Sequence, residues 1–486
     1  MNLVGASVKM FISKVIKSIG GFLAVIIFSR EAGASPLGTY YGFIAFIGIL
    51  SIPTDLGIES AAEKRISEGK DRDTYLASAI LLKSVIIIVP SVLLLLANNY
   101  INQYLGAELG YILVLILVID QGAGLGMRVL RGELRVGETA LIQTIHPLSW
   151  LTVGYYLYIQ GYGVSALVYG HLFGTILTLV ISWWKVETNV GYPSINACRS
   201  LFDYGKYSVV PSIGGTVYSW IDILILTLFL TEVGNITRGE IGAYENAWRL
   251  SLLALMISRS IETTIFPQFS QWDAEGATDR IEEVIPKAAL PSLLVVIPAF
   301  AGTIVLSKDL LRVLFGSEFT VAWLVLIIFS GEKVIQSLYG VFARPLMAID
   351  RPELSAYATI TSIIVNIILN IVLIFEFGII GAAAATTISF GLNTILHARY
   401  LNKFIKIDLP LFQAAWSAVV SLVMMLLVYI TSSIIVINTI PDLIFVVLFG
   451  VIIYVIGILI YSPTRTAIWQ MTKPIIGKFS SKVSVS

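Results

Sequence analysis

The sequence contains very little cysteine, histidine or charge. Cys198 is the one cysteine among 486 residues, which excludes an internal disulfide framework and any multi-cysteine metal site. The histidines His146, His171 and His397 are scattered without metal-ligand spacing, so no metal centre is expected. Charged residues make up 13% of the chain, whereas a soluble domain carries about 25%. The net charge of +1 gives no case for a nucleic-acid partner.

Two further absences narrow the class of protein. No G-x-x-x-x-G-K-[ST] phosphate loop is present, which excludes an ATP motor within this sequence. Apolar runs such as SVIIIVPSVLLLL do not alternate between apolar and polar residues, and this argues against a membrane β-barrel.

What the sequence has in abundance is apolar residues. They form 57% of the chain, and the mean hydropathy is +0.86. A run of about 20 apolar residues is long enough to cross a bilayer as a helix. We therefore predict an all-α, polytopic membrane protein with fourteen transmembrane helices at 8–29, 38–60, 76–97, 108–129, 140–160, 163–184, 207–230, 241–264, 285–306, 319–341, 355–376, 378–400, 412–436 and 440–461.

The basic residues orient these spans. Lys and Arg are enriched in cytoplasmic segments of membrane proteins. With a cytoplasmic N-terminus, only Arg30, Arg238, Lys308 and Arg312 fall in external segments. We expect a multi-pass protein of the cell membrane with both termini in the cytoplasm.

Short matched segments suggest an internal repeat. SIGG occurs at 18–21 and 212–215, LGTY at 37–40 corresponds to IGAY at 241–244, and Gly163 corresponds to Gly378. The first six predicted spans and the next six would be two copies of one unit. Because six is an even number, both copies enter the membrane in the same direction, which is typical of secondary transporters with parallel repeats. We predict two pseudo-symmetric lobes around a central cleft. The predicted parts are an N-lobe at 1–190, a C-lobe at 200–405, two further spans at 406–465 and a basic cytoplasmic tail at 466–486.

Three stretches resemble a known family. They are the N-terminal region SIGGFLAVIIFSREAGASPLGTYYGFIAFIGILSIPTDLGIESAAEKRIS, IGAYENAWRL from Ile241, and FGIIGAAAATTIS from Phe377. They resemble the Wzx-type polysaccharide flippases, part of the MOP superfamily that includes lipid II flippases and MATE exporters. The resemblance implies a flippase that moves a polyprenyl-diphosphate-linked oligosaccharide from the cytoplasmic to the outer leaflet by alternating access.

Such a substrate requires cations inside the membrane domain, because a diphosphate cannot cross hydrocarbon unaided. Charges within spans are costly and are therefore candidates for function. The candidate ligands of the diphosphate and sugar are Lys14, Lys17, Lys83, Arg249 and Glu245. The alternatives are snorkelling of the lysines to the interface and a local ion pair between Glu245 and Arg249, which share a helix face.

Acidic residues within spans are candidates for ion coupling. Asp55 and Glu59 are four residues apart and share one helix face, where they could bind a coupling proton or sodium ion. Asp222 is the third coupling candidate, and Asp120 and Glu262 are further acidic residues within spans. The alternative for Asp55 and Glu59 is a hydrogen-bonded polar site near a helix end. No cofactor other than a coupling ion is expected.

Two other charged groups have open roles. Arg128, Arg131 and Arg135 form a basic stripe that could attract anionic headgroups or capture the substrate diphosphate. Glu332 and Lys333 are adjacent, and neighbours in sequence do not face each other on a helix, so pairing with other helices is expected.

The main alternatives are an integral oligosaccharide polymerase and a MATE-like exporter of cationic drugs. A polymerase usually places its catalytic residues in a long external loop, whereas the external loops here are short. Drug export favours acidic over cationic cavity residues. We therefore expect a transporter rather than an enzyme, with lipid-linked oligosaccharide, membrane lipids and glycan-assembly proteins as partners.

Overall fold

The computed structural model describes residues 3–234, 236–256, 258, 259, 269, 272, 275, 278–349, 351–466 and 469. Helices dominate, and no β-strand occurs among these residues. Ten helices of the described chain are long and apolar enough to cross a membrane. The prediction of an all-α polytopic membrane protein is confirmed.

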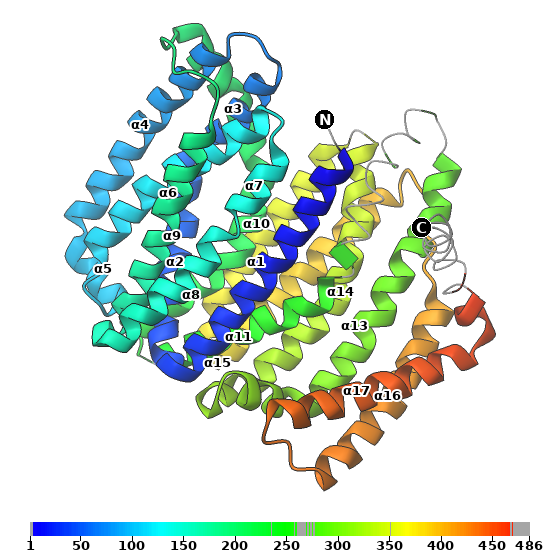
Figure 1. The fold of residues 1–486 in the computed structure, drawn as a ribbon. Helices are drawn as coiled ribbons and strands as arrows, with labels where there is room; N and C mark the ends of the chain where they lie inside the picture. The colour runs from blue at the N-terminus through cyan, green and yellow to red at the C-terminus, as the bar shows by residue number, and fades with distance from the viewer. Residues whose placement is uncertain are drawn as a thin grey trace, which may run out of the picture. The chain divides into compact units, whose positions relative to one another are not determined.

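The chain folds as two compact units. The first, unit 1, comprises residues 1–245 and 370–379. Its helices (Figure 1) are α1 (Leu3–Ala32), α2 (Ala34–Asp55), α3 (Ile58–Ser67), α4 (Arg72–Leu96), α5 (Asn98–Leu105), α6 (Gly110–Gly132), α7 (Val136–Ile142), α8 (Ile145–Leu157), the π-helical turn η1 (Tyr158–Tyr162), α9 (Val164–Lys185), α10 (Ile195–Glu232) and the first part of α11 (Arg238–Ser251).

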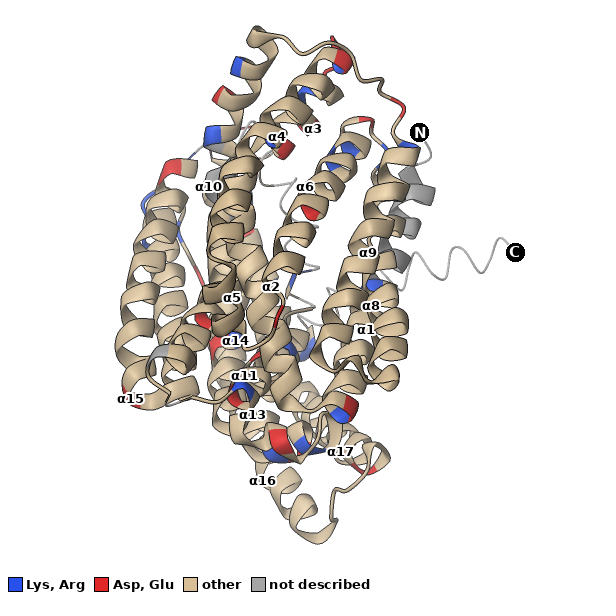
Figure 2. Cartoon of the chain, turned by 90° about the vertical axis from the view of Figure 1, so that its left-hand side faces the viewer, with Lys and Arg blue, Asp and Glu red and all other residues tan. Residues whose placement is uncertain are grey.

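Unit 2 comprises residues 246–369 and 380–486. After α11 it contains η2 (Leu252–Leu255), α13 (Thr278–Leu314), η3 (Ser317–Ala322), α14 (Trp323–Ala348), most of α15 (Pro352–Leu401), α16 (Leu411–Ile434) and α17 (Ile440–Ile460). Long stretches of helix carry neither basic nor acidic residues (Figure 2), as expected for helices that lie in hydrocarbon.

Contacts group the helices differently from the predicted lobes. In unit 1, α10 packs against α2, α3 and α4, and in unit 2, α16 and α17 pack against α13. The predicted span 207–230 therefore lies in the compact unit that also contains the predicted N-lobe. A repeat is defined by superposition rather than by contacts, so the lobe boundaries remain a prediction.

Two of the predicted spans that lie wholly in unit 1 are interrupted. The span 38–60 is divided by Leu56 and Gly57, which both have left-handed backbone geometry. Asp55 lies at the end of α2 and Glu59 lies in α3, so the prediction that they share one helix face is wrong. The span 140–160 is divided between the end of α7, the whole of α8 and the first part of η1.

The backbone supports the proposed repeat at two of the matched pairs of segments. Gly163 has φ 56° and ψ −136°, and its predicted counterpart Gly378 has φ 55° and ψ −132°. The glycines of LGTY and IGAY also face each other, because a Cβ on Gly38 would lie 3.1 Å from the Gly242 nitrogen, and the reverse distance is also 3.1 Å. Reciprocal contact between equivalent residues is what a two-fold relation produces.

Glycines set the helix packing in unit 1, because small residues let membrane helices approach closely. A Cβ on Gly170 would lie 2.7 Å from the Gly154 backbone of α8. A Cβ on Gly126 would lie 2.6 Å from the Ser182 hydroxyl of α9. Only glycine permits these close approaches between α8, α6 and α9.

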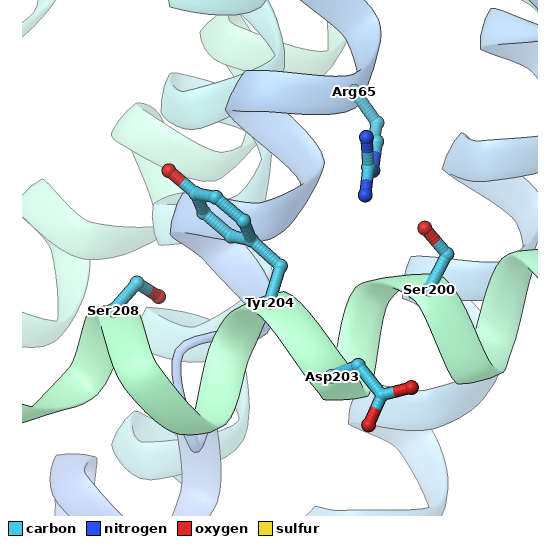
Figure 3. Close-up of a pocket in the computed structure, with 5 residues that line it drawn as sticks. All are labelled: Arg65, Ser200, Asp203, Tyr204 and Ser208. Atoms are coloured by element: carbon cyan, nitrogen blue, oxygen red, sulfur yellow. The ribbon is translucent and has the colours of Figure 1, made fainter.

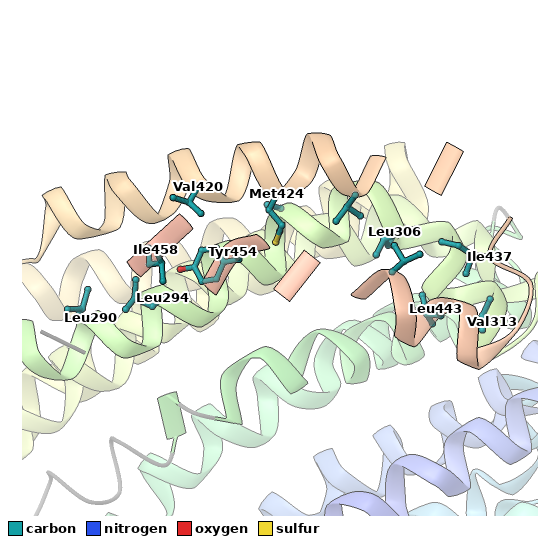
Figure 4. Close-up of a cluster of buried hydrophobic side chains, with 13 residues drawn as sticks. Leu290, Leu294, Leu306, Val313, Val420, Met424, Ile437, Leu443, Tyr454 and Ile458 are labelled. Carbon is teal, nitrogen blue, oxygen red and sulfur yellow. The ribbon is translucent and has the colours of Figure 1, made fainter. Parts of the chain in front are cut away.

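Unit 2 contains a largely apolar cluster (Figure 4). Aliphatic side chains of α13, α16 and α17 pack together there, and a hydrogen bond of 2.7 Å joins the Ser417 and Tyr454 hydroxyls. Its buried members are Leu290, Leu294, Ala301, Leu306, Val313, Val420, Met424, Val428, Ile437, Leu443, Val446, Tyr454 and Ile458.

Candidate functional site

A charged network surrounds the helix break in unit 1. The Asp55 carboxylate at the end of α2 accepts hydrogen bonds from the backbone nitrogens of Gly57, at 3.1 Å, and Glu59, at 3.0 Å. It therefore binds the unpaired amides at the start of α3. The break is what brings the side chains of Asp55 and Glu59 to the same place.

Lys83 of α4 joins these two carboxylates. Its ammonium lies 3.2 Å from Asp55 Oδ1 and 2.5 Å from Glu59 Oε1, and the residue is 6% exposed. Lys83 was predicted to bind the substrate diphosphate. In this conformation it is instead held by two carboxylates, which satisfy its charge.

Helix α6 completes the network. Arg128 lies 2.8 Å from a Glu63 oxygen and 3.7 Å from a Glu59 oxygen. One turn earlier, Gly124 leaves room for Glu59, because a Cβ there would lie 2.3 Å from the Glu59 carboxylate. Three carboxylates thus share two cations, and Asp120 adds a further carboxyl close enough to Lys83 for their charges to interact. The network has more acidic than basic groups, so it can accept a proton or another cation.

Lys17 lies in a different environment. Its side chain on α1 is exposed and donates a hydrogen bond of 3.4 Å to Gln143. Arg131 is its electrostatic neighbour, and no described carboxylate lies within ion-pair distance of either cation, although Glu59 and Glu63 act on Arg131 from farther away. Two neighbouring cations without a direct ion pair are suited to bind an anion. The Lys14 side chain and Glu262 lie outside the described residues.

Asp222 lies in a second polar group of unit 1. It is 6% exposed on α10, and its carboxylate accepts hydrogen bonds from the Tyr244 hydroxyl, at 2.6 Å, and the Asn370 amide, at 2.8 Å. These bonds join α10, α11 and α15.

Glu245 and Arg249 both lie on α11, four residues apart. Glu245 is 3% exposed, and the Arg249 side chain is partly buried. They belong to units 1 and 2 respectively, and their predicted roles in substrate binding remain predictions.

Two of the three arginines of the basic stripe form ion pairs with carboxylates. Besides Arg128, Arg135 forms ion pairs with Glu133, Glu138 and Glu187 and donates to the Lys185 carbonyl. Hydrogen bonds from Arg135 and Lys185 lower the pKa of Glu138 to about 2. Arg131 is the member of the stripe that retains the capacity to bind an anion.

Sequence reasoning missed a histidine pair and was wrong only in placing Glu332 and Lys333 out of reach of each other. The rings of His146 and His171 lie 4.2 Å apart, because Gly174 lets α9 approach α8 at His146. In unit 2, Lys333 contacts the neighbouring Glu332 directly and lies 3.5 Å from the Trp248 ring centre. Long side chains can curl around the helix toward each other even though their Cβ atoms diverge, so Glu332 and Lys333 do face each other.

Comparison with known proteins identifies the family. A model described as a polysaccharide biosynthesis protein matches residues 27–324. The chain is 42% identical over 465 residues to a protein of Haloferax volcanii described as the probable low-salt glycan biosynthesis flippase Agl15, covering 96% of this chain and 97% of that protein. The chain belongs to the polysaccharide biosynthesis protein family.

One further sequence relative and one solved structure are also similar to this chain. The probable flippase AglR, also of Haloferax volcanii, is 28% identical, with 86% of this chain and 87% of that protein covered. The inward-closed structure of the lipid II flippase MurJ superposes with a TM-score of 0.78 at 20% identity, covering 93% of this chain and 98% of that chain. This family member thus has the fold of the lipid II flippase MurJ, in agreement with the fold that the sequence resemblance predicted.

Proposed function

We propose that this protein is a flippase that moves a lipid-linked oligosaccharide from the cytoplasmic to the outer leaflet by alternating access. The family assignment and the glycan flippase named among its relatives support this function. The observation that carries it is the pair of cations Lys17 and Arg131, neither of which forms an ion pair with a carboxylate of the described residues. A lipid-linked diphosphate supplies the anion that such a pair lacks.

The proposed substrate ligands of unit 1 are Lys17 and Arg131, with Lys14 and Glu245 as further candidates, and Arg249 is a separate candidate in unit 2. Lysine acts as a point charge, whereas arginine offers a planar fork for two phosphate oxygens. Arg249→Ala should therefore reduce transport more than Arg249→Lys. For the same reason, Lys17→Arg should be tolerated and Lys17→Ala should not.

The Asp55–Glu59–Lys83 network is the proposed coupling site. Its excess of carboxylates favours uptake of a proton or sodium ion, and an incoming cation would compete with Lys83 for Asp55 and Glu59. Release of Lys83 would then free an ammonium for the substrate diphosphate. Asp222 is a second candidate, because its three-helix contact could respond to protonation.

The direct test is transport in proteoliposomes that contain purified protein and the extracted lipid-linked glycan. A membrane-impermeant lectin or glycosidase measures glycan that has reached the far leaflet. Wild-type protein should move the lipid unchanged, and the Lys17→Ala/Arg131→Ala double variant should not. Chain elongation of the glycan would indicate a polymerase, and transport of cationic drugs without glycan movement would indicate an exporter. Either result rejects the flippase.

The proposed location is the cell membrane with both termini in the cytoplasm. The distribution of basic residues supports this orientation. A reporter that is active only outside the cell, fused after Ser486, should give no signal. A positive signal would reverse the orientation or change the number of spans.

A further inference from the structure

A pocket of 660 Å³ lies between α3 and α10 of unit 1, apart from the charged network and from Lys17 (Figure 3). Its volume is within the range of small-ligand sites. The residues that line it are polar or aromatic: Arg65, Ser200, Asp203, Tyr204 and Ser208.

The helical period explains how α10 presents these groups. Ser200, Tyr204 and Ser208 follow each other at intervals of four residues and so share one face of the helix. Arg65 extends toward that face from α3, as Figure 3 shows. Side chains from two helices thereby converge on one space.

Glycines hold the two helices together beside the pocket. A Cβ on Gly57 would lie 2.2 Å from the Gly205 carbonyl oxygen, so the helix break between α2 and α3 lies directly against α10. The Ser208 hydroxyl is 3.4 Å from the Gly57 carbonyl. The same break positions Asp55 and Glu59, which connects the pocket through α3 to the proposed coupling site.

The charges of the pocket are balanced. Arg65 forms an ion pair of 3.1 Å with Glu68, and Asp203 forms one of 2.7 Å with Lys206. The Lys206 hydrogen bond lowers the pKa of Asp203, so this carboxylate is charged at neutral pH. A phosphate group would meet the negative charge of Asp203 and is therefore disfavoured.

A polyhydroxylated ligand fits this set of groups better. Sugar hydroxyls both donate and accept, so they can bond to a carboxylate, a guanidinium and two serine hydroxyls at once. The Tyr204 side chain adds an apolar ring face and is 38% exposed. We propose that this pocket binds a sugar unit of the lipid-linked oligosaccharide at the membrane surface, an inference that rests on the proposed flippase function.

Binding measurements on the full-length, detergent-solubilised protein test this site. Native mass spectrometry would compare two probes: the lipid-linked glycan extracted from cells that make it, and the same polyprenyl carrier bearing phosphate without sugar. Arg65→Gln and Tyr204→Ala should each weaken binding of the glycan-bearing lipid about five- to tenfold, as expected for the loss of one or two hydrogen bonds or ring contacts. Neither substitution should change binding of the sugar-free carrier.

Matched controls come from surface residues of the same types. Arg280 forms an exposed ion pair with Glu275 in unit 2, and Tyr192 precedes α10 with 91% exposure. Arg280→Gln and Tyr192→Ala should bind both probes as wild type does. Thermal unfolding of each variant identifies any loss of fold.

The possible outcomes separate this inference from the proposed function. Equal weakening for both lipid probes would assign the pocket to the lipid phosphate and overturn the sugar site. A second outcome is that the folded Arg65→Gln and Tyr204→Ala proteins bind the glycan-bearing lipid as wild type does, while the wild-type protein transports it. This result would reject the pocket as a sugar site and would not contradict the flippase function. If wild-type protein neither binds nor moves the glycan lipid, both proposals fail.

Discussion

The helix break of unit 1 and the apolar cluster of unit 2 use opposite means to join helices. Around the break, Lys83 and Arg128 of two helices share the carboxylates of Asp55, Glu59 and Glu63. Around Met424, aliphatic side chains of α13, α16 and α17 interdigitate (Figure 4).

The difference separates a responsive region from a supporting one. A buried ion network costs desolvation energy and adds little net stability over apolar packing. Its partners can, however, exchange when a proton, a cation or an anionic ligand arrives. Apolar packing has no such alternative partners, so we expect charge substitutions to affect transport in the first region and packing substitutions to affect only stability in the second.

The largest expected effect is at Lys83. Lys83→Met leaves Asp55 and Glu59 without their shared ammonium and should destabilise the protein by about 3–5 kcal/mol. Thermal unfolding in detergent and transport in proteoliposomes should both show the loss. Lys206→Met removes a lysine from an exposed pair with Asp203 and should change the stability much less, because solvent screens exposed charges. Equal losses for the two variants would contradict the importance of the buried network.

Alanine at Gly57 tests whether the helix break creates the network. Gly57 has a φ of +79°, and its Cβ would meet the Gly205 carbonyl at 2.2 Å. Gly161 has a φ of +89° but open space around it. Gly161→Ala should cost about 1–2 kcal/mol for backbone strain alone. Gly57→Ala should add about 1–3 kcal/mol for overpacking and should also reduce transport. A Gly57→Ala protein that unfolds no earlier than Gly161→Ala would show that α3 and α10 can separate without cost.

Met424→Ala examines the apolar side of the comparison. Met424 of α16 is 5% exposed and packs against α13 and α17. The substitution should cost about 2 kcal/mol, at the low end for core truncations, because lipid is as apolar as the cluster itself. Transport per folded molecule should equal that of wild type. A folded variant with reduced transport would give the cluster a part in the transport cycle.

The smallest expected effect concerns an exposed ion network. The pKa of Glu138 is about 2 instead of 4.5, because Arg135 and Lys185 donate to its carboxylate. Its stabilising contribution is therefore complete above pH 4.5 and decreases as the pH falls toward 2. Glu138 is 34% exposed, so solvent screening limits this contribution to about 1 kcal/mol. Glu138→Gln should remove that part of the acid-dependent loss of thermal stability, whereas Glu187→Gln, at a 79% exposed position, should change it less.

The sequence alone determined the class of the protein and the position of most spans. Apolar runs need no knowledge of their neighbours, since each helix satisfies its own backbone hydrogen bonds within the membrane. The glycine marks also carried information, because the left-handed geometry at Gly163 and Gly378 is a local requirement. The interruptions at Leu56–Gly57 and near Gln143 were missed, because the apolar residues on both sides of each point outweigh the few polar residues between them in a window of about 20 residues.

Only the tertiary structure decided which charged groups meet. Lys83 lies 24 residues from Glu59 in sequence and 28 from Asp55, and the packing of α4 against α2 and α3 brings them together. The same holds for His146 and His171, whose contact depends on a glycine of α9. A span reveals its charges in the sequence, but their partners depend on the rotation and approach of other helices, which small residues at distant positions control.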